Sequence, residues 1–334
     1  MHLSPTLSKN ILAWYDNSKR NLPWRVGKKS PKKLYYRLLS EFMLQQTQVK
    51  TVIPYFRKFT KKYKSLQVFS KINENQVLKL WEGLGYYRRA RNLLATTKLL
   101  VKHHNSKLPR SLKELKKLPG IGEYTANALL GFVYNKPTIA VDGNVKRIFA
   151  RYLNKKESKI KFDELIAQNK ENLFIANRNS DFVEALMEFG ALVCKPKDPQ
   201  CKQCCLNKSC KYIKSSKKTE TNIIKKVKIT HYDIFCHLNK KKRLIALTKK
   251  NKISFLKNFN LPSIKKMKNK TENKNWKFLK NYRNSISNQK LNINLYYKFS
   301  NKIPLTYQWY SLIKNKEFIP SFTKRIFNHV TSLF

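Results

Sequence analysis

Apolar residues recur with helical spacing through the first 213 residues of the chain. Two clear examples are LYYRLLSEFMLQQTQVKTVIPYFRKF at residues 34–59 and EYTANALLGFVY at residues 123–134. Short loops that contain proline or glycine, such as NLPWRVGKKSP and EGLGYY, separate the helical segments. The pattern therefore predicts a mainly α-helical domain over residues 1–213.

The pattern changes after a group of clustered cysteines. Residues 214–228 are rich in lysine and poor in core-forming side chains, which is typical of a linker. Beyond them, the short runs HYDIFCHL, RLIALT and LNINLYYKFS have the character of β-strands, and FTKRIFNHVTSLF at residues 322–334 has helical spacing. We expect residues 229–334 to form a second, smaller α+β domain.

The charge balance of the 334-residue chain is strongly basic. Its formal charge is +52, from 71 lysines and arginines against 19 acidic residues. Such a field attracts nucleic acids through counterion release. The chain is also rich in asparagine and isoleucine, a composition that A+T-rich codons produce without selection for binding, so charge alone supports a nucleic-acid partner only weakly. No apolar run approaches a membrane span and the chain does not open on a signal peptide, so we expect a cytoplasmic protein.

The stretch LPGIGEYTA at residues 118–126 places Gly120 and Gly122 directly before a helical segment. Glycines allow a sharp bend and leave the N–H groups of the helix N-terminus exposed, which suits a DNA phosphate. An ordinary connection between two helices with a glycine cap fits LPGIG equally well.

Asp142 follows twenty residues after Gly122 and opens another helical segment, GNVKRIFARYL. An aspartate in this place is often only an N-cap, although a rigidly held capping carboxylate can also face a cleft. The two motifs at this distance resemble the helix-hairpin-helix superfamily of base-excision DNA glycosylases. In that superfamily the aspartate stabilises the positive charge on a sugar that is losing its base.

Four of the six cysteines, Cys194, Cys201, Cys204 and Cys210, have the spacing C-x6-C-x2-C-x5-C. In a reducing compartment such clustering favours metal binding over disulfides. Four thiolates suit either a [4Fe–4S] cluster or a structural zinc ion, and the spacing alone does not separate the two. The loop is similar to the cluster loop of the endonuclease III and adenine glycosylase families, which implies an iron–sulfur cluster and leaves Cys205 as an extra thiol.

Glu41 lies among apolar residues in LLSEFMLQQTQV. A lone glutamate on a helix is usually a solvated or ion-paired surface group. A carboxyl in apolar surroundings, however, has a raised pKa, as a general acid requires. The string resembles the signature of the adenine DNA glycosylase family of the MutY type, which removes adenine mispaired with 8-oxoguanine, whereas endonuclease III relatives lack the glutamate in this context.

Further motifs extend this resemblance over the first 213 residues, namely LPWR at residues 22–25, LQQTQ at 44–48, WEGLGYYRRARNL at 81–93 and FVEALMEFG at 182–190. The resemblance implies that the base pocket contains Trp24, Arg25 and Glu184. It also implies that the DNA is contacted by Gln45, Gln48, Tyr86, Gly120 and Gly122.

Tyr124 takes the position at which the bifunctional relatives carry a lysine. That amine forms a Schiff base that leads to strand cleavage, and a phenol cannot form the imine. The resemblance therefore implies a monofunctional enzyme with Glu41, Asp142 and Tyr124 in its catalytic site, the tyrosine hydroxyl being available to hold Asp142 or the reacting sugar.

The second domain shows scattered matches to the same family. YYKFSNKIPL is similar to the Phe-Ser-His loop with which the Nudix-like domain of the family reads 8-oxoguanine; Phe299 and Ser300 are kept, and Asn301 replaces the histidine. NFNLPSI at residues 258–264 keeps only the proline and the hydrophobic frame of another family turn. The cluster of metal-binding glutamates of a Nudix hydrolase is absent, so we do not expect hydrolysis of nucleotide pyrophosphates.

The sequence thus predicts a mainly α, two-lobed helix-hairpin-helix glycosylase domain with a [4Fe–4S] loop, followed by a smaller α+β Nudix-like domain. The expected substrate is double-stranded DNA in which adenine is mispaired with 8-oxoguanine or guanine, and we expect a nucleoid-associated monomer. Two alternatives stay open. One is a bifunctional endonuclease III-type glycosylase for oxidised pyrimidines, against which Tyr124 and Glu41 argue. The other is a non-enzymatic, metal-containing DNA-binding protein in which Glu41 and Asp142 are structural.

Overall fold

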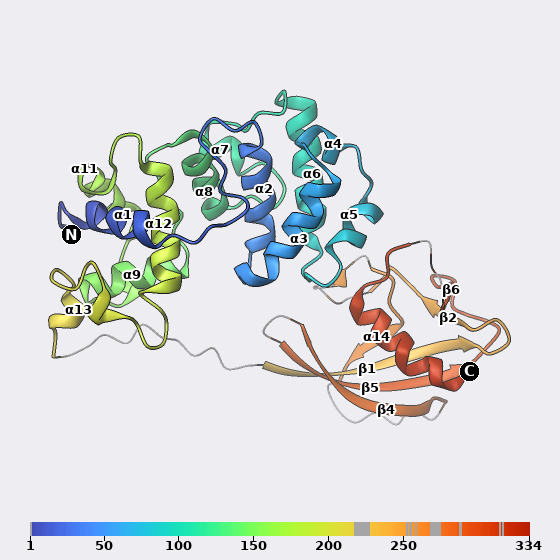
Figure 1. The fold of residues 1–334 in the computed structure, drawn as a ribbon. Helices are drawn as coiled ribbons and strands as arrows, with labels where there is room; N and C mark the ends of the chain where they lie inside the picture. Colours follow the sequence, from blue (N-terminus) through green and yellow to red (C-terminus); the bar gives the residue numbers. More distant parts are fainter. Residues whose placement is uncertain are drawn as a thin grey trace. The chain divides into compact units, whose positions relative to one another are not determined.

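The chain forms two compact units in the computed structural model (Figure 1). The first unit consists of Met1–Ile72 and Arg88–Ile223, and the second of Asn73–Tyr87 and Ile224–Phe334. The residues that the structure describes are 2–216, 228–251, 253, 256–257, 259–267, 275–286, 289–313, 315 and 317–334. Within these ranges, no helix is both long and apolar enough to cross a membrane. Residues 217–227 of the predicted linker and Asn258 of NFNLPSI lie outside the described residues.

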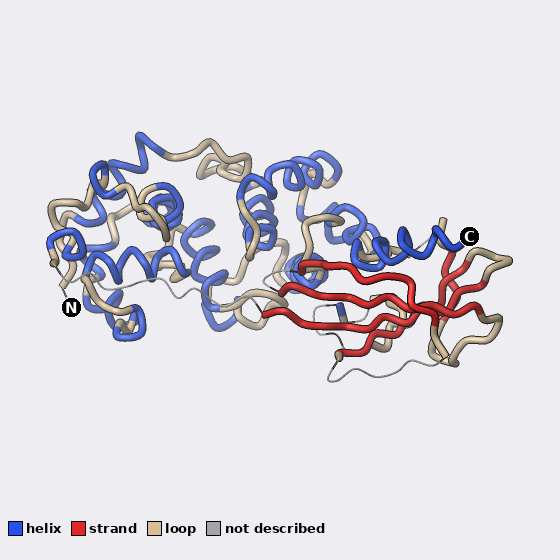
Figure 2. Tube along the Cα trace, turned by 90° about the horizontal axis from the view of Figure 1, so that it is seen from below, coloured by secondary structure: helices blue, strands red, loops and turns tan. Residues whose placement is uncertain are grey.

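The first unit is built from helices, as the sequence predicts (Figure 2). Its helices are α1 (Leu7–Ser18), α2 (Lys33–Leu44), α3 (Val49–Lys62), α4 (Leu66–Ser70), α6 (Arg88–His103), α7 (Leu112–Leu115), α8 (Glu123–Tyr134), α9 (Gly143–Leu153), α10 (Phe162–Gln168), α11 (Lys170–Leu173), α12 (Asn179–Leu192) and α13 (Lys211–Lys214). The helical pattern of residues 34–59 spans two helices, because the backbone leaves α2 after Leu44 and Gln46 takes a left-handed φ of 57°. This break creates the turn on which the candidate site depends.

Polar side chains set the ends of several helices. Ser65, Ser111 and Asp142 each cap a helix by accepting a hydrogen bond from the backbone N–H three residues later, which satisfies a donor that the helix itself leaves open. At the other end, Asn135 and Asn154 close α8 and α9 in the left-handed conformation that asparagine tolerates. Local sequence therefore fixes where α8 and α9 begin and end.

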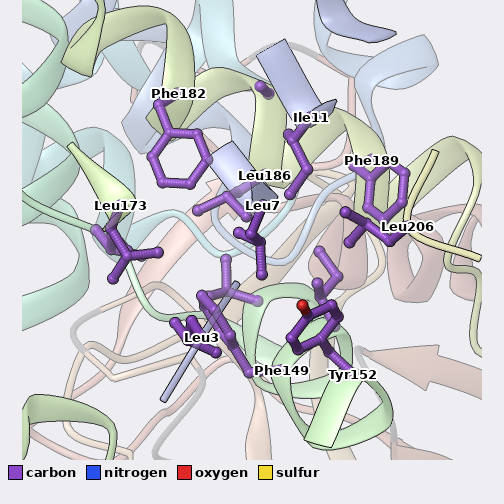
Figure 3. Packing of buried hydrophobic residues seen from close by; sticks show 14 of the residues in the cluster. Leu3, Leu7, Ile11, Phe149, Tyr152, Leu173, Phe182, Leu186, Phe189 and Leu206 are labelled. Atoms are coloured by element: carbon purple, nitrogen blue, oxygen red, sulfur yellow. The ribbon is translucent and has the colours of Figure 1, made fainter. Parts of the chain in front are cut away.

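The main core of the first unit joins the N-terminal helix to the second half of the domain. Figure 3 shows Leu7 and Ile11 of α1 packed with Phe149 of α9 and with Phe182 and Phe189 of α12. Leu206 of the cysteine loop is buried in the same cluster. The packing holds α9, α12 and the cysteine loop as one body.

The second unit contains a mixed six-stranded sheet with the order β4-β5-β1-β2-β6, and β3 pairs with β1. Its elements are α5 (Glu74–Trp81), β1 (Lys228–Asn239), β2 (Leu244–Leu247), β3 (Ser263–Lys266), β4 (Lys277–Ile286), β5 (Gln289–Phe299), β6 (Gln308–Ser311) and α14 (Ser321–Val330). β1 and β5 run parallel along their whole length, and the other pairs are antiparallel. The predicted α+β domain, its three expected strands and its C-terminal helix are confirmed. The sequence analysis missed β3, β4 and β6, which are short or rich in lysine and asparagine.

Residues 73–87 belong to the second unit although their sequence reads as one more helix of the first. The hydroxyl groups of Tyr87 and Ser321 are 2.8 Å apart, and the Tyr87 ring packs edge-on against Phe259 and Phe318. Lys324 of α14 also forms an ion pair with Glu82 at 2.6 Å. The loop that follows α5 is therefore held by α14 and its aromatic neighbours.

Candidate active site

A cleft of about 410 Å³ opens in the first unit where the end of α2 meets the beginnings of α8 and α9. Three separate stretches of chain line it, and the lining residues are Glu41, Leu44, Gln45, Gln46, Gly120, Gly122, Tyr124, Thr125 and Asp142. The fold thus brings together six residues that the sequence analysis singled out, namely Glu41, Gln45, Gly120, Gly122, Tyr124 and Asp142.

Glu41 is the buried acid of this cleft, with only 5% of its surface exposed. Burial raises the pKa of its carboxyl to about 7, because an ion loses hydration there. The Arg37 guanidinium, one turn earlier on α2, acts in the opposite direction, and the carboxylates of Glu184 and Asp142 raise the pKa further. As its apolar flanks predict, Glu41 therefore holds its proton near neutral pH.

Asp142 is held rigidly at the N-terminus of α9. Its Oδ1 accepts a hydrogen bond from the backbone N–H of Val145 at 2.8 Å, and its Oδ2 accepts one from the Asn144 amide at 2.9 Å. The structure therefore confirms the N-cap interpretation and also places the carboxylate on the cleft wall. A carboxylate fixed in this way needs no reorganisation to oppose a developing positive charge.

Tyr124 forms part of the wall between Glu41 and Asp142. Its hydroxyl donates a long hydrogen bond, 3.8 Å, to the sulfur of Met187. Burial, together with the charges of Glu41 and Asp142, raises the pKa of the phenol well above its ordinary value, so the ring stays neutral. Among the described contacts none joins this hydroxyl to Asp142, so the expected support of the aspartate is not seen.

The two glycines of the hairpin between α7 and α8 have different reasons to be glycine. Gly120 has a left-handed φ of 77°, and a Cβ there would lie 2.7 Å from Phe42 and 2.8 Å from Asn92. Gly122 caps α8 with extended backbone that any residue adopts, and a Cβ there would meet nothing. The turn thus requires Gly120, whereas Gly122 keeps the N-terminus of α8 open.

The turn after α2 is fastened to this hairpin. The side-chain amide of Gln45 donates to the Gly120 carbonyl at 3.4 Å and to the Thr125 hydroxyl at 3.3 Å. The buried guanidinium of Arg89 donates to the carbonyls of Phe42 and Met43, which end α2. The sequence analysis missed Arg89, since a basic residue among many others carries no local signal of burial.

A buried ion-pair network lies next to Glu41 and contains two of the predicted pocket residues. Glu184 forms ion pairs with Arg25 and Arg37 and accepts a hydrogen bond of 2.7 Å from the Tyr15 hydroxyl. Arg25 also donates to Glu188 at 2.8 Å. Pairing with an opposite charge offsets the free energy that each of these ions loses when it is removed from water.

Trp24, the remaining predicted pocket residue, is 3% exposed and packs edge-on against Phe56. It lies in the core beside the network and does not line the cleft with Glu41. Gln48 is exposed and begins α3 without a side-chain cap bond.

The four spaced cysteines lie in the segment that follows α12. Burial raises the pKa of the Cys204 thiol to about 11, and the charges of Cys194, Cys210 and Cys201 raise it as well, so these sulfurs lie within electrostatic reach of one another. Of the four, only Cys204 acts on the pKa of Cys205. That Cys205 is the extra thiol stays a prediction.

Donors from the protein point at this group of thiols. The backbone N–H of Leu206 donates to Cys204 Sγ at 3.4 Å, and the Arg151 guanidinium lies 3.6 Å from Cys194 Sγ. In the described part of the chain, no three histidine, cysteine or acidic side chains are close enough to hold a single metal ion. Hydrogen-bond donors of this kind are usual around metal-bound sulfurs.

One buried arginine connects the cysteine loop with the cleft. Arg147 of α9 donates to the carbonyls of Cys194 and Gly190 and to the Asn144 side chain, each at 2.8 Å. Asn144 in turn donates to Asp142. The position of the cleft aspartate is therefore coupled to the beginning of the cysteine loop.

Comparisons with known proteins agree with this geometry. A family model described as HhH-GPD superfamily base excision DNA repair protein matches residues 39–171. An adenine DNA glycosylase of Buchnera aphidicola subsp. Baizongia pistaciae is 38% identical over 248 residues, which are 71% of this chain and 70% of that protein. The adenine DNA glycosylase of Buchnera aphidicola subsp. Schizaphis graminum is 38% identical over 81% of this chain and 73% of that protein.

The chain belongs to the adenine DNA glycosylase family. It is therefore a DNA glycosylase that acts in base-excision repair, and DNA is its substrate, as the sequence predicts. A solved thermostable thymine-DNA glycosylase is 26% identical to it, with a TM-score of 0.56 over 63% of this chain and 95% of that one. A complex of endonuclease III with DNA has a TM-score of 0.51 at 21% identity and shows the shared helical fold.

The predicted DNA-contacting residues outside the first unit lie in the second unit. Tyr86 has a left-handed φ of 49° and lines a cavity with residues of α14. Phe299 ends β5 and is 43% exposed. The Ser300 hydroxyl bonds to the Lys302 backbone, and Asn301 is exposed and accepts a hydrogen bond from Asn239 at 3.2 Å.

Proposed function

We propose that this enzyme hydrolyses the N-glycosidic bond of adenine paired with 8-oxoguanine, or with guanine, in duplex DNA and leaves an abasic site. The observation that supports this most directly is the pair of unlike carboxyls in one cleft. Burial keeps Glu41 protonated near pH 7, and the N-cap geometry fixes Asp142 on the neighbouring wall. Such a pair supplies an acid and an anion for glycosidic cleavage.

The chemistry follows from the leaving group. Adenine must first be flipped out of the stack, at a cost of a few kcal/mol. Glu41 then protonates N7, since adenine is a poor leaving group as an anion. Asp142 stabilises the oxocarbenium-like sugar electrostatically or through a transient covalent bond, and Glu41 serves as base for the attacking water.

Tyr124 supports a monofunctional reaction. No amine stands at this position, and the neutral phenol beside Glu41 and Asp142 cannot form an imine with C1′ of the sugar. The product we propose is therefore an intact strand with an abasic site.

The open N-terminus of α8 supports a phosphate contact close to the cleft. Gly122 leaves the first N–H groups of the helix without side-chain caps, and a Cβ at Gly122 would project into open space. A helix N-terminus in this state favours anions. We assign Gly120, Gly122 and Gln45 to the contact with the DNA backbone. Arg25 and Glu184 would support the base pocket.

The cysteine loop supports a [4Fe–4S] cluster held by Cys194, Cys201, Cys204 and Cys210. When bound, the cluster would tie the four thiolates into one rigid loop and would take no redox step in base removal. Leu206 and Arg151 direct donors at the sulfurs, and Arg147 transmits the position of the loop to Asn144.

The amide of Asn301 supports recognition of 8-oxoguanine by the second unit. The backbone N–H of Lys242 donates to Asn239 Oδ1, so the Asn239 amide nitrogen must face Asn301 Oδ1. This leaves Asn301 Nδ2 to donate outward. 8-Oxoguanine carries the acceptor O8 where guanine carries a C–H, so the donor favours the oxidised base.

The test is a single-turnover assay on an end-labelled duplex with adenine opposite 8-oxoguanine, analysed with and without hot alkali. We expect cleavage of the adenine strand only after alkali. Glu41→Gln and Asp142→Asn should each lower the rate by at least about 10²-fold while duplex binding persists. Glu164→Gln, an exposed glutamate paired with Lys161, is the matched control and should keep the parental rate. Strand breaks without alkali, or full turnover in either cleft variant, would contradict the proposal.

A further inference from the structure

The turn between β1 and β2 is a run of four cations, Lys240, Lys241, Lys242 and Arg243. All four side chains are exposed, and the turn is tight enough for Arg243 to take a φ of 50°. No ion pair with a carboxylate is found for any of them within the described ranges. Unpaired like charges held together by a short turn repel one another, so an anionic partner would relieve a standing cost.

Exposed apolar side chains lie in the two loops that begin beside this turn. Leu305, at the tip of the loop after β5, is fully exposed, Ile313 after β6 is 78% exposed, and Phe299 is 43% exposed. A folded protein seldom leaves several large apolar side chains so open in one place without a partner.

Hydrogen bonds join these groups into one surface. The backbone N–H of Ser300 donates to the Leu238 carbonyl at 2.9 Å, and that of Leu312 donates to the Arg243 carbonyl at 3.2 Å. Lys240 Nζ lies 5.7 Å from the centre of the Phe299 ring. The starts of both apolar loops are therefore fixed against the basic turn at one end of the sheet. We call residues 240–243, 299–305 and 313 the basic edge.

We propose that the basic edge is a duplex-DNA contact in which Lys241 and Lys242 neutralise backbone phosphates and Leu305 packs as an apolar wedge against the opened groove. The choice of duplex DNA as the partner rests on the proposed function. Cations supply sequence-independent affinity, and an exposed aliphatic side chain beside them is what proteins use to enter a disturbed base step.

The basic edge also supports the loop at residues 299–301, which we call the lesion loop, through a series of hydrogen bonds. The Lys242 backbone N–H that begins the chain Lys242, Asn239, Asn301 is part of the basic turn. Phosphates bound to this turn would fix the place from which Asn301 donates. The basic edge thus sets the register of the lesion loop on the DNA.

The experiment compares two double variants of the full-length protein that remove equal charge. Lys241→Gln/Lys242→Gln alters the basic edge, and Lys250→Gln/Lys266→Gln removes two exposed lysines from the same unit, at the far end of β2 and on β3 opposite Tyr232. The probe is an undamaged 25-base-pair duplex, and affinity is measured from low to moderate salt. A plot of the logarithm of the association constant against the logarithm of the salt concentration has a negative slope. We expect this slope to become less steep by about 2 in the first variant and to stay unchanged in the second.

A single variant tests the wedge. Leu305→Ser should weaken duplex binding about 5-fold without changing the salt slope, because it removes apolar contact and no charge. Val68→Ser, at an apolar residue that is 47% exposed in the first unit, is the matched control and should bind as the parent does.

Equal slopes for the two lysine variants would overturn the phosphate contact, and parental affinity in Leu305→Ser would overturn the wedge. These results are separate from the fate of the proposed function, since binding to undamaged DNA needs no excision. A protein that binds as expected but removes adenine from neither mispair would refute the proposed substrate. The DNA contact at the basic edge would still be supported.

Discussion

At the scale of single residues, environment separates two similar side chains. Glu41 and Asp142 line one cleft, but the Glu41 side chain is buried, whereas Asp142 accepts hydrogen bonds at a helix N-terminus. Burial therefore favours the neutral form of Glu41. This difference is the physical basis on which we propose Glu41 as the acid and Asp142 as the anion.

The raised pKa of Glu41 predicts a pH-dependent cost in stability. A folded-state pKa of about 7, above the ordinary 4.5, means that the native state binds the proton more tightly than the unfolded chain. Stability is then lost as pH rises from 4.5 through 7. We expect Glu41→Gln to be more stable than the parent at pH 8, by about 3 kcal/mol, and to differ little at pH 4.5. Thermal denaturation at both pH values checks this, and a pH-independent difference would contradict it.

At the scale of elements, the turn between α7 and α8 contains two glycines with different roles, one in folding and one in the proposed DNA contact. Gly120 is required by its φ and by the closeness of Phe42 and Asn92. Gly122 has ordinary backbone and open space around it. The two glycines of LPGIG therefore have different roles, although the sequence does not distinguish them.

Substitution by alanine should expose this difference. Gly120→Ala should lower the free energy of unfolding by at least about 2 kcal/mol, because the new Cβ is strained and overlaps its neighbours. Gly122→Ala should change stability by less than about 1 kcal/mol and still weaken DNA binding, since its methyl group stands at the open end of α8. Urea unfolding and fluorescence anisotropy measure the two effects, and equal losses of stability would refute the distinction.

At the scale of the whole molecule, the second unit takes in a segment from the middle of the helical sequence. The loop that carries Tyr86 is anchored through Tyr87 to Ser321 and to the rings of Phe259 and Phe318. A residue that we assign to the DNA contact thus depends on α14, which is more than 230 positions away in the chain.

A double-mutant cycle tests this anchor. Tyr87→Phe and Ser321→Ala each remove one partner of the 2.8 Å hydrogen bond. We expect a coupling energy of about 1 kcal/mol in urea unfolding, typical of a partly buried hydrogen bond. Tyr63→Phe with Ser321→Ala, which changes one residue in each unit, should be additive. Additivity in the first cycle would mean that the bond contributes nothing to the anchor.

The sequence by itself determined the local features. Helical periodicity gave the helical first domain, and Asp142 marked the start of α9 because capping is a property of neighbouring residues. Apolar flanks predicted the raised pKa of Glu41. Alternation of side chains located β1, β2 and β5, but β4 escaped because its lysines and asparagines hide the alternation.

Only the tertiary structure decided the rest. Glu41, Gly120 and Asp142 meet in one cleft because α2, α8 and α9 pack together, and no local pattern encodes that distance. The burial of Arg89 and Arg147, the ion pairs of Glu184, the core position of Trp24 and the place of residues 73–87 in the second unit all depend on contacts between distant segments. Charge, hydrogen bonding and burial at these positions are properties of the packed chain, since each is set by neighbours that the sequence brings near only when it folds.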